Sequence, residues 1–168
     1  MNEDVYQATL RQRAHRRFTD QPVTDDELAK VLEAGRWTGS AKNAQPWGFV
    51  VVRDPERKEA LADTARFGVP LRAAPMAIAL VGTRDAYEFD IGRLAQNMML
   101  AADAIGLGTC PVTLYESVKA KELLKVPVDH HLRYALAVGH PDRSAPSRAP
   151  SSGGGRKPLH DIVSDEIF

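Results

Sequence analysis

The chain has 168 residues, and its 22 Lys and Arg balance 22 Asp and Glu to a formal net charge of zero. A neutral chain has no overall field to attract nucleic acid or an anionic membrane surface, so we expect neither as a partner. The single cysteine excludes an intrachain disulfide framework and a cysteine-rich zinc site. The length suits one domain over residues 1–168.

The sequence starts without the basic and apolar segments of a secretory signal, and no apolar stretch approaches the ~20 residues that span a bilayer. We therefore expect a soluble cytoplasmic protein. Serine, proline, alanine and glycine dominate the stretch at about 144–155. Such a composition does not pack by itself, so a flexible arm is predicted there, and it would carry the apolar C-terminus to another surface, for example a partner subunit.

Three helices are predicted. Thr24 and Glu27 have the spacing of a capping box, and an apolar stripe follows at Leu28, Val31 and Leu32. A second helix is expected to open at Asp54-Pro55, with Leu61, Ala62 and Ala65 on its apolar face. The third runs from Ile91 to Ile105, where apolar residues recur three and four apart, and it is predicted to be buried and central.

Four short apolar runs bounded by glycine or proline are predicted strands: residues 49–52, 76–81, 110–114 and 134–138. Because these runs are continuously apolar, we expect helices to cover both faces of the sheet. The alternation of helices and strands predicts a three-layer mixed architecture, and it leaves the strand order open.

A polar loop follows the first predicted helix, where Ser40, Lys42, Asn43 and Gln45 crowd the stretch before Trp47. A loop held between a helix and a strand can direct its side chains at a ligand, so it is interpreted as a binding site. Basic residues also cluster at 11–17 and again at 156–157. Together the two basic clusters suggest one bound phosphate.

Four segments, in this order, carry a resemblance to a known family: residues 13–18, residues 40–47, residues 96–102 continuing into 106–110, and residues 156–163. Over nearly the whole chain the sequence resembles the FMN-dependent nitroreductase family. The resemblance implies an α+β fold, namely a three-layer α/β/α sandwich with a mixed, mainly antiparallel central sheet. It also implies a homodimer with FMN sites at the subunit interface.

The resemblance assigns the FMN phosphate and ribityl chain to Arg13, Ala14, His15 and Arg16, with Arg156 and Lys157 closing over them. Arg13 and Arg16 would face the same way if the first helix continues through them. The family usually has serine where this chain has Ala14, so a backbone donor or Arg16 must substitute. The loss of one neutral hydrogen bond costs about 1 kcal/mol, which weakens binding roughly fivefold.

For the flavin ring, the resemblance implies contacts from the opposite subunit by Ser40, Ala41, Asn43 and Gln45. Gly39 stands where the family more often has proline, and Lys42 where it has a small residue. A lysine near the ring would stabilise negative charge on the reduced flavin, whereas a solvated Lys42 would do nothing there.

Pro111, Val112 and Thr113 match the family strand whose backbone faces the reactive nitrogen of the flavin. Gly106 and Gly108, just before it, are interpreted as close-approach positions.

Cys110 is interpreted as a buried core residue, since no second cysteine is present. No metal site is predicted at His130-His131, because adjacent side chains in a turn or strand point apart.

The resemblance implies an enzyme that passes hydride from NADH or NADPH through FMN to a small electron-poor acceptor, such as a nitroaromatic or a quinone, by a ping-pong mechanism. No catalytic side chain is assigned, because the FMN carries the chemistry. A non-catalytic FMN carrier or sensor remains the alternative, and so do relatives that dehalogenate, desaturate or cleave the flavin. A Rossmann enzyme built on Gly106-Leu107-Gly108 is disfavoured, since a third glycine and a following acidic residue are not at the required spacing.

Overall fold

The computed structural model describes residues 3–144 and 155–167. Its sheet is four-stranded, in the order β1-β2-β4-β3, and each neighbouring pair is antiparallel. The strands are β1 (Trp47–Val52), β2 (Met76–Gly82), β3 (Gly108–Thr113) and β4 (His131–Gly139). All four predicted strands are confirmed, although their ends differ from the predicted ones by up to three residues.

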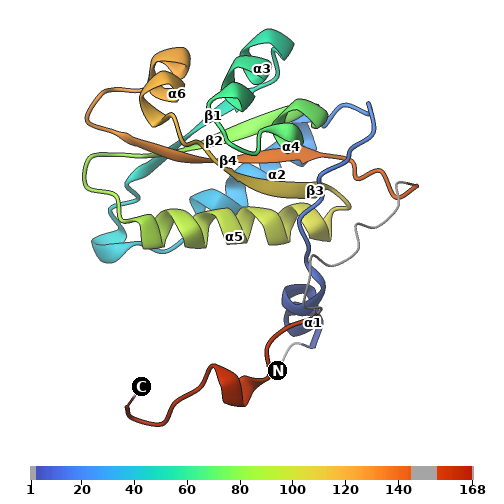
Figure 1. Cartoon of the computed structure of the whole chain (residues 1–168), viewed down its shortest axis with the longest axis vertical. Helices are drawn as coiled ribbons and strands as arrows, with labels where there is room; N and C mark the ends of the chain where they lie inside the picture. The colour runs from blue at the N-terminus through green and yellow to red at the C-terminus, as the bar shows by residue number, and fades with distance from the viewer. Residues whose placement is uncertain (1–2, 145–154, 168) are drawn as a thin grey trace.

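Helices cover both faces of this sheet, as Figure 1 shows. The helices are α1 (Glu3–Arg11), α2 (Asp25–Arg36), α3 (Pro55–Asp63), α4 (Val69–Ala73), α5 (Glu88–Ala104) and α6 (Ser117–Leu124), with short 3-10 turns at Ala41–Asn43 and Leu159–Asp161. Helices α2 and α5 pack on one face, and α3, α4 and α6 pack on the other. The predicted three-layer α/β/α arrangement is confirmed.

Strand β2, one of the two interior strands, explains why the sheet needs two covering layers. Every residue of β2 is buried, and successive side chains of a strand point to opposite faces. Ile78 and Leu80 belong to the core under α2 and α5, whereas Ala77 and Ala79 belong to the core under α3, α4 and α6. A continuously apolar strand is therefore the expected sequence for this position.

The predicted helix starts are confirmed. The Glu27 backbone N–H donates to Thr24 Oγ1 at 3.2 Å, and the Thr24 N–H donates to Glu27 Oε2 at 2.8 Å, which completes the capping box of α2. Asp54 accepts a bond from the Arg57 N–H at 2.8 Å, with Pro55 at the first helical position of α3.

The first helix does not continue through Arg13 and Arg16, so the condition under which their side chains would face the same way is not met. Helix α1 ends at Arg11. Beyond it, Ala14 forms an isolated parallel bridge with Thr109 of β3. The edge of β3 offers backbone groups that replace the next helical hydrogen bonds, so the chain leaves the helix and runs along the sheet. This isolated bridge is parallel, whereas the pairs of neighbouring strands in the four-stranded sheet are all antiparallel.

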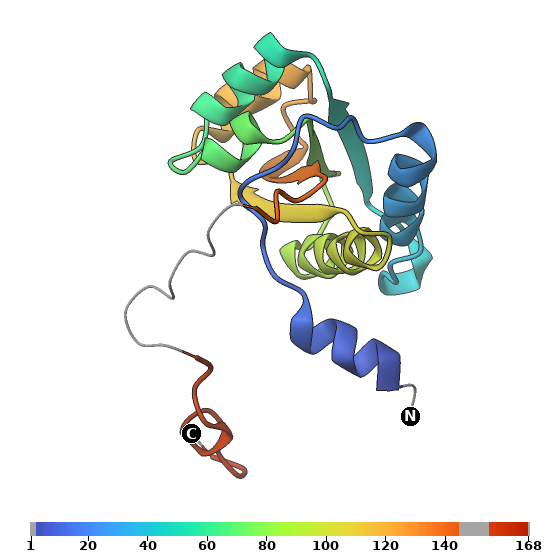
Figure 2. The same cartoon turned by 90° about the vertical axis from the view of Figure 1, so that its right-hand side faces the viewer.

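Helix α1 and residues 155–167 lie outside the three layers, on the side of α5 away from the sheet (Figures 1 and 2). Most of the predicted arm at about 144–155 falls outside the described residues. Within the described parts of the chain, no helix combines the length and the apolar character that crossing a bilayer requires.

Candidate functional site

A cavity of about 600 Å³ opens between β3, α4 and the segment that follows α1. Its lining residues are Arg16, Ala65, Arg66, Phe67, Gly68, Val69, Pro70, Arg72, Cys110, Pro111, Val112, Thr113 and Tyr115. The volume lies in the range of small-molecule and cofactor sites. Of the residues predicted to bind the cofactor, the cavity brings together Arg16, Pro111, Val112 and Thr113.

The charges around the cavity favour an anion. Its described lining contains three arginines and no carboxylate. Arg72 is already paired, since its Nε lies 2.6 Å from Glu59 Oε1 and its Nη2 pairs with Asp63. Within residues 3–144 and 155–167, by contrast, no ion pair is formed by Arg16. Its guanidinium is therefore available to an external anion such as a phosphate.

Backbone contacts hold Arg16 at this position. The His15 N–H donates to the carbonyl oxygen of Thr109 at 2.7 Å. The segment approaches so closely because Gly108 has no side chain: a Cβ there would lie 2.9 Å from His15 Cβ. Gly108 is confirmed as a close-approach position. Gly106 is not one, because its Cβ position is open and its φ of +85° makes it the left-handed exit of α5.

Within the part of β3 that lines the cavity, one backbone amide points away from β4. The Leu114 N–H donates to Arg133 O at 2.8 Å, toward β4. Since amides of an antiparallel strand alternate in direction, the amide of Val112 also faces β4, whereas that of Thr113 points to the open edge. Pro111 has no N–H, which an edge strand tolerates. Among residues 111–113, the Thr113 amide is therefore the one that β4 leaves open, and the role predicted for this backbone toward the flavin stays a prediction.

Cys110 is buried, at 4% exposure, as predicted. Burial raises the pKa of its thiol, and the nearby Arg16 offsets the rise only in part. The thiol is therefore protonated at neutral pH and is a poor nucleophile.

The polar loop lies away from this cavity, near the N-terminal end of α5 (Figure 1). Ser40 Oγ accepts a bond from the Gln45 N–H at 2.8 Å. Lys42, Asn43 and Gln45 have φ of 54°, 54° and 49°. This left-handed conformation costs Lys42 and Gln45 about 1–2 kcal/mol each, whereas asparagine tolerates it better. Such strain gathers at functional sites. Within one chain, the predicted flavin contacts Ser40, Ala41, Asn43 and Gln45 do not reach the cavity.

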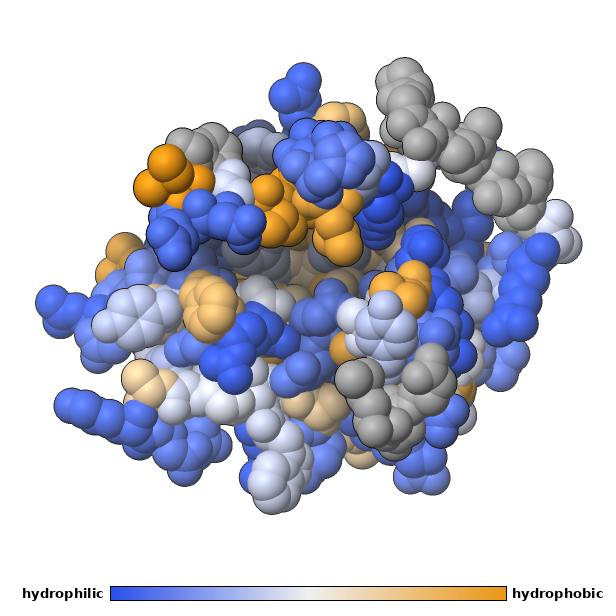
Figure 3. Space-filling model, turned by 90° about the horizontal axis from the view of Figure 1, so that it is seen from below, coloured by the Kyte–Doolittle hydropathy of each residue, from blue (hydrophilic) through white to orange (hydrophobic). Residues whose placement is uncertain are grey.

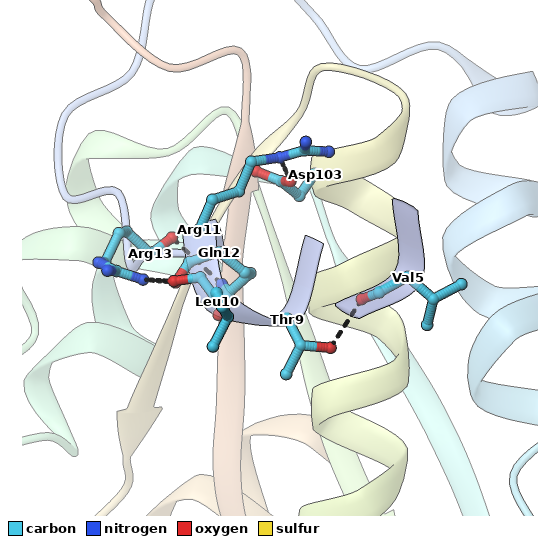
Figure 4. A network of polar contacts seen from close by, with 7 residues as sticks. All are labelled: Val5, Thr9, Leu10, Arg11, Gln12, Arg13 and Asp103. Atoms are coloured by element: carbon cyan, nitrogen blue, oxygen red, sulfur yellow. Dashed lines mark hydrogen bonds and ion pairs between the residues drawn. The ribbon is translucent and has the colours of Figure 1, made fainter. Parts of the chain in front are cut away.

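Arg13 also points elsewhere. Figure 4 shows its guanidinium at the end of α1, where Nη1 donates to Leu10 O at 2.6 Å and to Gln12 O at 2.8 Å. Arg156 and Lys157 are exposed in the segment outside the layers. Ala14 and His15 lie beside β3 through the Thr109 bridge and are not part of the cavity lining. The roles predicted for these residues stay predictions.

Sequence reasoning did not assign the wall formed by residues 65–70, Arg72 and Tyr115. The available signal was local: Gly68 and Pro70 interrupt the helical pattern directly after Arg66 and Phe67. An arginine and an aromatic residue beside turn residues are typical of a binding loop.

At the histidine pair, His130 Nδ1 lies 2.9 Å from Asp129 Oδ1, and His131 Nε2 lies 3.2 Å from Arg84 O, so the two rings have different partners.

A sequence model described as the nitroreductase family matches residues 10–88 and 70–140. This chain belongs to the nitroreductase family. Protein DrgA of Synechocystis is 28% identical over 202 residues, covering 95% of both chains. NADPH-flavin oxidoreductase of Vibrio harveyi is 27% identical over 193 residues, covering 100% of this chain and 75% of that protein.

A solved structure of a Desulfovibrio desulfuricans protein in complex with FMN is 32% identical, with a TM-score of 0.82, and the match covers 100% of this chain and 99% of that one. The family resemblance seen in the sequence and its implied α+β fold are both confirmed.

Proposed function

We propose that this member of the nitroreductase family binds FMN in the 600 Å³ cavity and transfers hydride from NADH or NADPH to a small electron-poor acceptor by a ping-pong mechanism. The observation that carries the proposal is that Arg16, which forms no ion pair within the described residues, meets the open edge of β3 in one cavity. The FMN complex of the D. desulfuricans relative supports the cofactor. Nitroaromatics and quinones are the acceptor classes we would test first.

The lining fits a molecule with an anionic end and a flat aromatic end. Arg16 lies near Thr109, where the His15 bond holds it. Thr113 lies four residues further along β3, a distance of roughly 14 Å at ~3.4 Å per residue. Phe67 and Val69 add apolar surface at the mouth. A phosphate at Arg16 and a ring system near Thr113 can therefore occupy the cavity together.

When bound, FMN would supply the two-electron hydride chemistry. Arg16 would hold the phosphate through charge-assisted hydrogen bonds. The Thr113 amide would donate a hydrogen bond to the ring edge, and Phe67 with Val69 would limit the access of water. No side chain of the cavity needs to act as a nucleophile, in accord with the protonated thiol of Cys110.

We further propose that residues 1–168 form one FMN-binding domain that works as a homodimer in the cytoplasm. The loop bearing Ser40, Ala41, Asn43 and Gln45 would complete the cavity of the partner, and Arg156 with Lys157 would close over the phosphate. Figure 3 shows apolar side chains exposed on the side of α1 and the C-terminal segment. The exposed apolar side chains of α1 and the C-terminal segment include Val5, Leu10, Leu159, Ile162 and Val163, which a second subunit would cover.

The test is the visible spectrum of the purified protein before and after anaerobic NADH or NADPH, together with its mass in solution. We expect a yellow dimer that bleaches within seconds. Protein that stays colourless after incubation with FMN and gel filtration would overturn the proposal. Yellow protein that neither nucleotide reduces would identify the carrier or sensor alternative.

A further inference from the structure

A second cavity, of about 250 Å³, lies where β3 ends and β4 begins. It is lined by Glu88, Thr113, Leu114, Tyr115, Ser117, Lys121, His130, His131, Leu132 and Arg133. The start of β4, α6 and the first turn of α5 meet at this end of the sheet (Figure 1). Thr113 and Tyr115 line both cavities, so the second opens beside the residue to which the flavin ring is assigned.

A lysine ammonium is fixed in the wall of this second cavity. Lys121 Nζ donates to Val128 O at 2.9 Å and to His130 O at 3.3 Å. An ammonium has three protons, so at least one is left for another acceptor. Because the two carbonyls hold the charge in place, less side-chain freedom is lost when a ligand binds it.

Arg133 adds a second cation. Its Nε lies 4.0 Å from Glu88 Oε1, the long limit of an ion pair, and its side chain is 60% exposed. Glu88 Oε2 also accepts a bond from the Tyr134 hydroxyl at 3.3 Å. Glu88 is the one carboxylate in the described lining, set against Lys121 and Arg133. The permanent charges of the lining therefore leave an excess of one positive charge.

We propose that this second cavity binds the anionic group, a carboxylate or a phosphate, of the compound that exchanges hydride at the flavin. The proposal rests on the proposed function, because it requires the flavin ring near Thr113. A neutral acceptor needs no cation at that end, and Arg16 already serves the cofactor phosphate. The anion can belong to the acceptor or to the nicotinamide nucleotide, and kinetics separate the two.

The experiment compares Lys121→Gln with the matched variant Lys119→Gln in the FMN-loaded protein. Glutamine removes the charge of Lys121 and keeps donors for the two carbonyls. Lys119 lies on the same helix, pairs with Glu116 and does not line the cavity. KM and kcat are measured for NADH, NADPH, 4-nitrobenzoate and nitrobenzene. We expect Lys121→Gln to raise KM for the anionic substrate that uses the cavity by roughly tenfold.

If Lys121→Gln raises KM for 4-nitrobenzoate but not for nitrobenzene, the cavity binds the carboxylate of the acceptor. If Lys121→Gln raises KM for NADH or NADPH alone, the cavity binds a phosphate of the nucleotide. Glu88→Gln should act in the opposite direction and lower the same KM, which damage to the fold would not produce. Unchanged KM values, or equal changes for nitrobenzene and 4-nitrobenzoate with unchanged nucleotides, would overturn the inference. A wild-type protein without FMN would instead overturn the proposed function, and the inference with it.

Discussion

The backbone N–H of His15 donates to the carbonyl oxygen of Thr109 at 2.7 Å. This bond joins the segment after α1 to the edge strand β3, and it places Arg16 beside the buried Cys110. The proposed phosphate-binding arginine and the strand proposed to present a donor to the flavin ring are thus held together by a backbone hydrogen bond. Disturbing this contact should disturb the site without changing any side chain that lines the cavity.

Gly108→Ala makes that disturbance. The added Cβ would lie 2.9 Å from His15 Cβ and 3.1 Å from Pro141 Cβ. Overpacking of this kind costs typically 1–3 kcal/mol, and the His15 segment must move away from β3. We expect a lower urea midpoint together with weaker FMN binding by flavin fluorescence titration.

Gly48→Ala is the control for this substitution, since a Cβ at Gly48 meets nothing within 4 Å. Its stability should stay within about 0.5 kcal/mol of the wild type. If Gly108→Ala behaved like Gly48→Ala in both measurements, close packing at His15 would not be what holds Arg16 in place.

Arg16→Gln should weaken FMN binding more than any other single change in the cavity. Hydrogen bonds to a charged group contribute about 1.5–3 kcal/mol, which corresponds to a roughly 10- to 150-fold higher Kd. Arg16→Lys keeps the charge but loses the planar fork, so an intermediate Kd is expected. Arg53→Gln is the control, because Arg53 pairs on the surface with Asp25 at 2.7 Å. Equal Kd values for FMN in Arg16→Gln and wild type would show that Arg16 does not bind the phosphate.

The helix starts and the buried strand were predicted correctly because each is determined by residues that are close together in the sequence. Thr24 and Glu27 lie three residues apart, and Asp54 directly precedes Pro55, so the pattern and the contact that it forms are contained in one short segment. The apolar continuity of β2 predicted two covering layers for the same reason. Each of these signals depends on neighbours in the chain and on the period of the element.

The positions that sequence reasoning missed depend on contacts between distant segments. Residues 12–16 have no strong helix breaker, and only the edge of β3 draws them out of the helix. Phe67 and Tyr115 meet at the cavity because α4 and the end of β3 are neighbours in space, which no periodic pattern records. Side chains on irregular segments carry the least local information and much of the site.

The capping box gives a prediction about pH. The Thr24 backbone N–H, as the main cause, lowers the pKa of Glu27 below its ordinary 4.5, with smaller contributions from His140 and Lys30. A carboxylate whose pKa is lower in the folded state stabilises the fold above pH 4.5, and this stability is lost as the pH falls below that value. Glu27→Gln should therefore lose about 0.3–1 kcal/mol at pH 7 and show a flatter decline between about pH 5 and 3.

Urea unfolding at a series of pH values measures both effects. Glu56→Gln, in the first turn of α3, is the matched control: within the described residues its side chain forms no ion pair. Parallel stability curves for wild type and Glu27→Gln would show that the carboxylate charge contributes nothing to the start of α2.

Lys42 and Lys125 have the same left-handed φ of 54°. Replacing each with glycine tests whether the strained backbone of the polar loop contributes to FMN binding. Lys125 ends α6, and its N–H bonds the carbonyl oxygens of Glu122 and Lys121. Lys125→Gly should stabilise the protein by about 0.5–1 kcal/mol, because glycine adopts this conformation without the steric cost. It should leave FMN binding unchanged.

Lys42→Gly should relieve a similar strain and also loosen the loop that carries Asn43 and Gln45. We therefore expect a higher melting temperature but a higher Kd for FMN in Lys42→Gly, whereas a gain in stability with an unchanged Kd would separate the loop from the cofactor site.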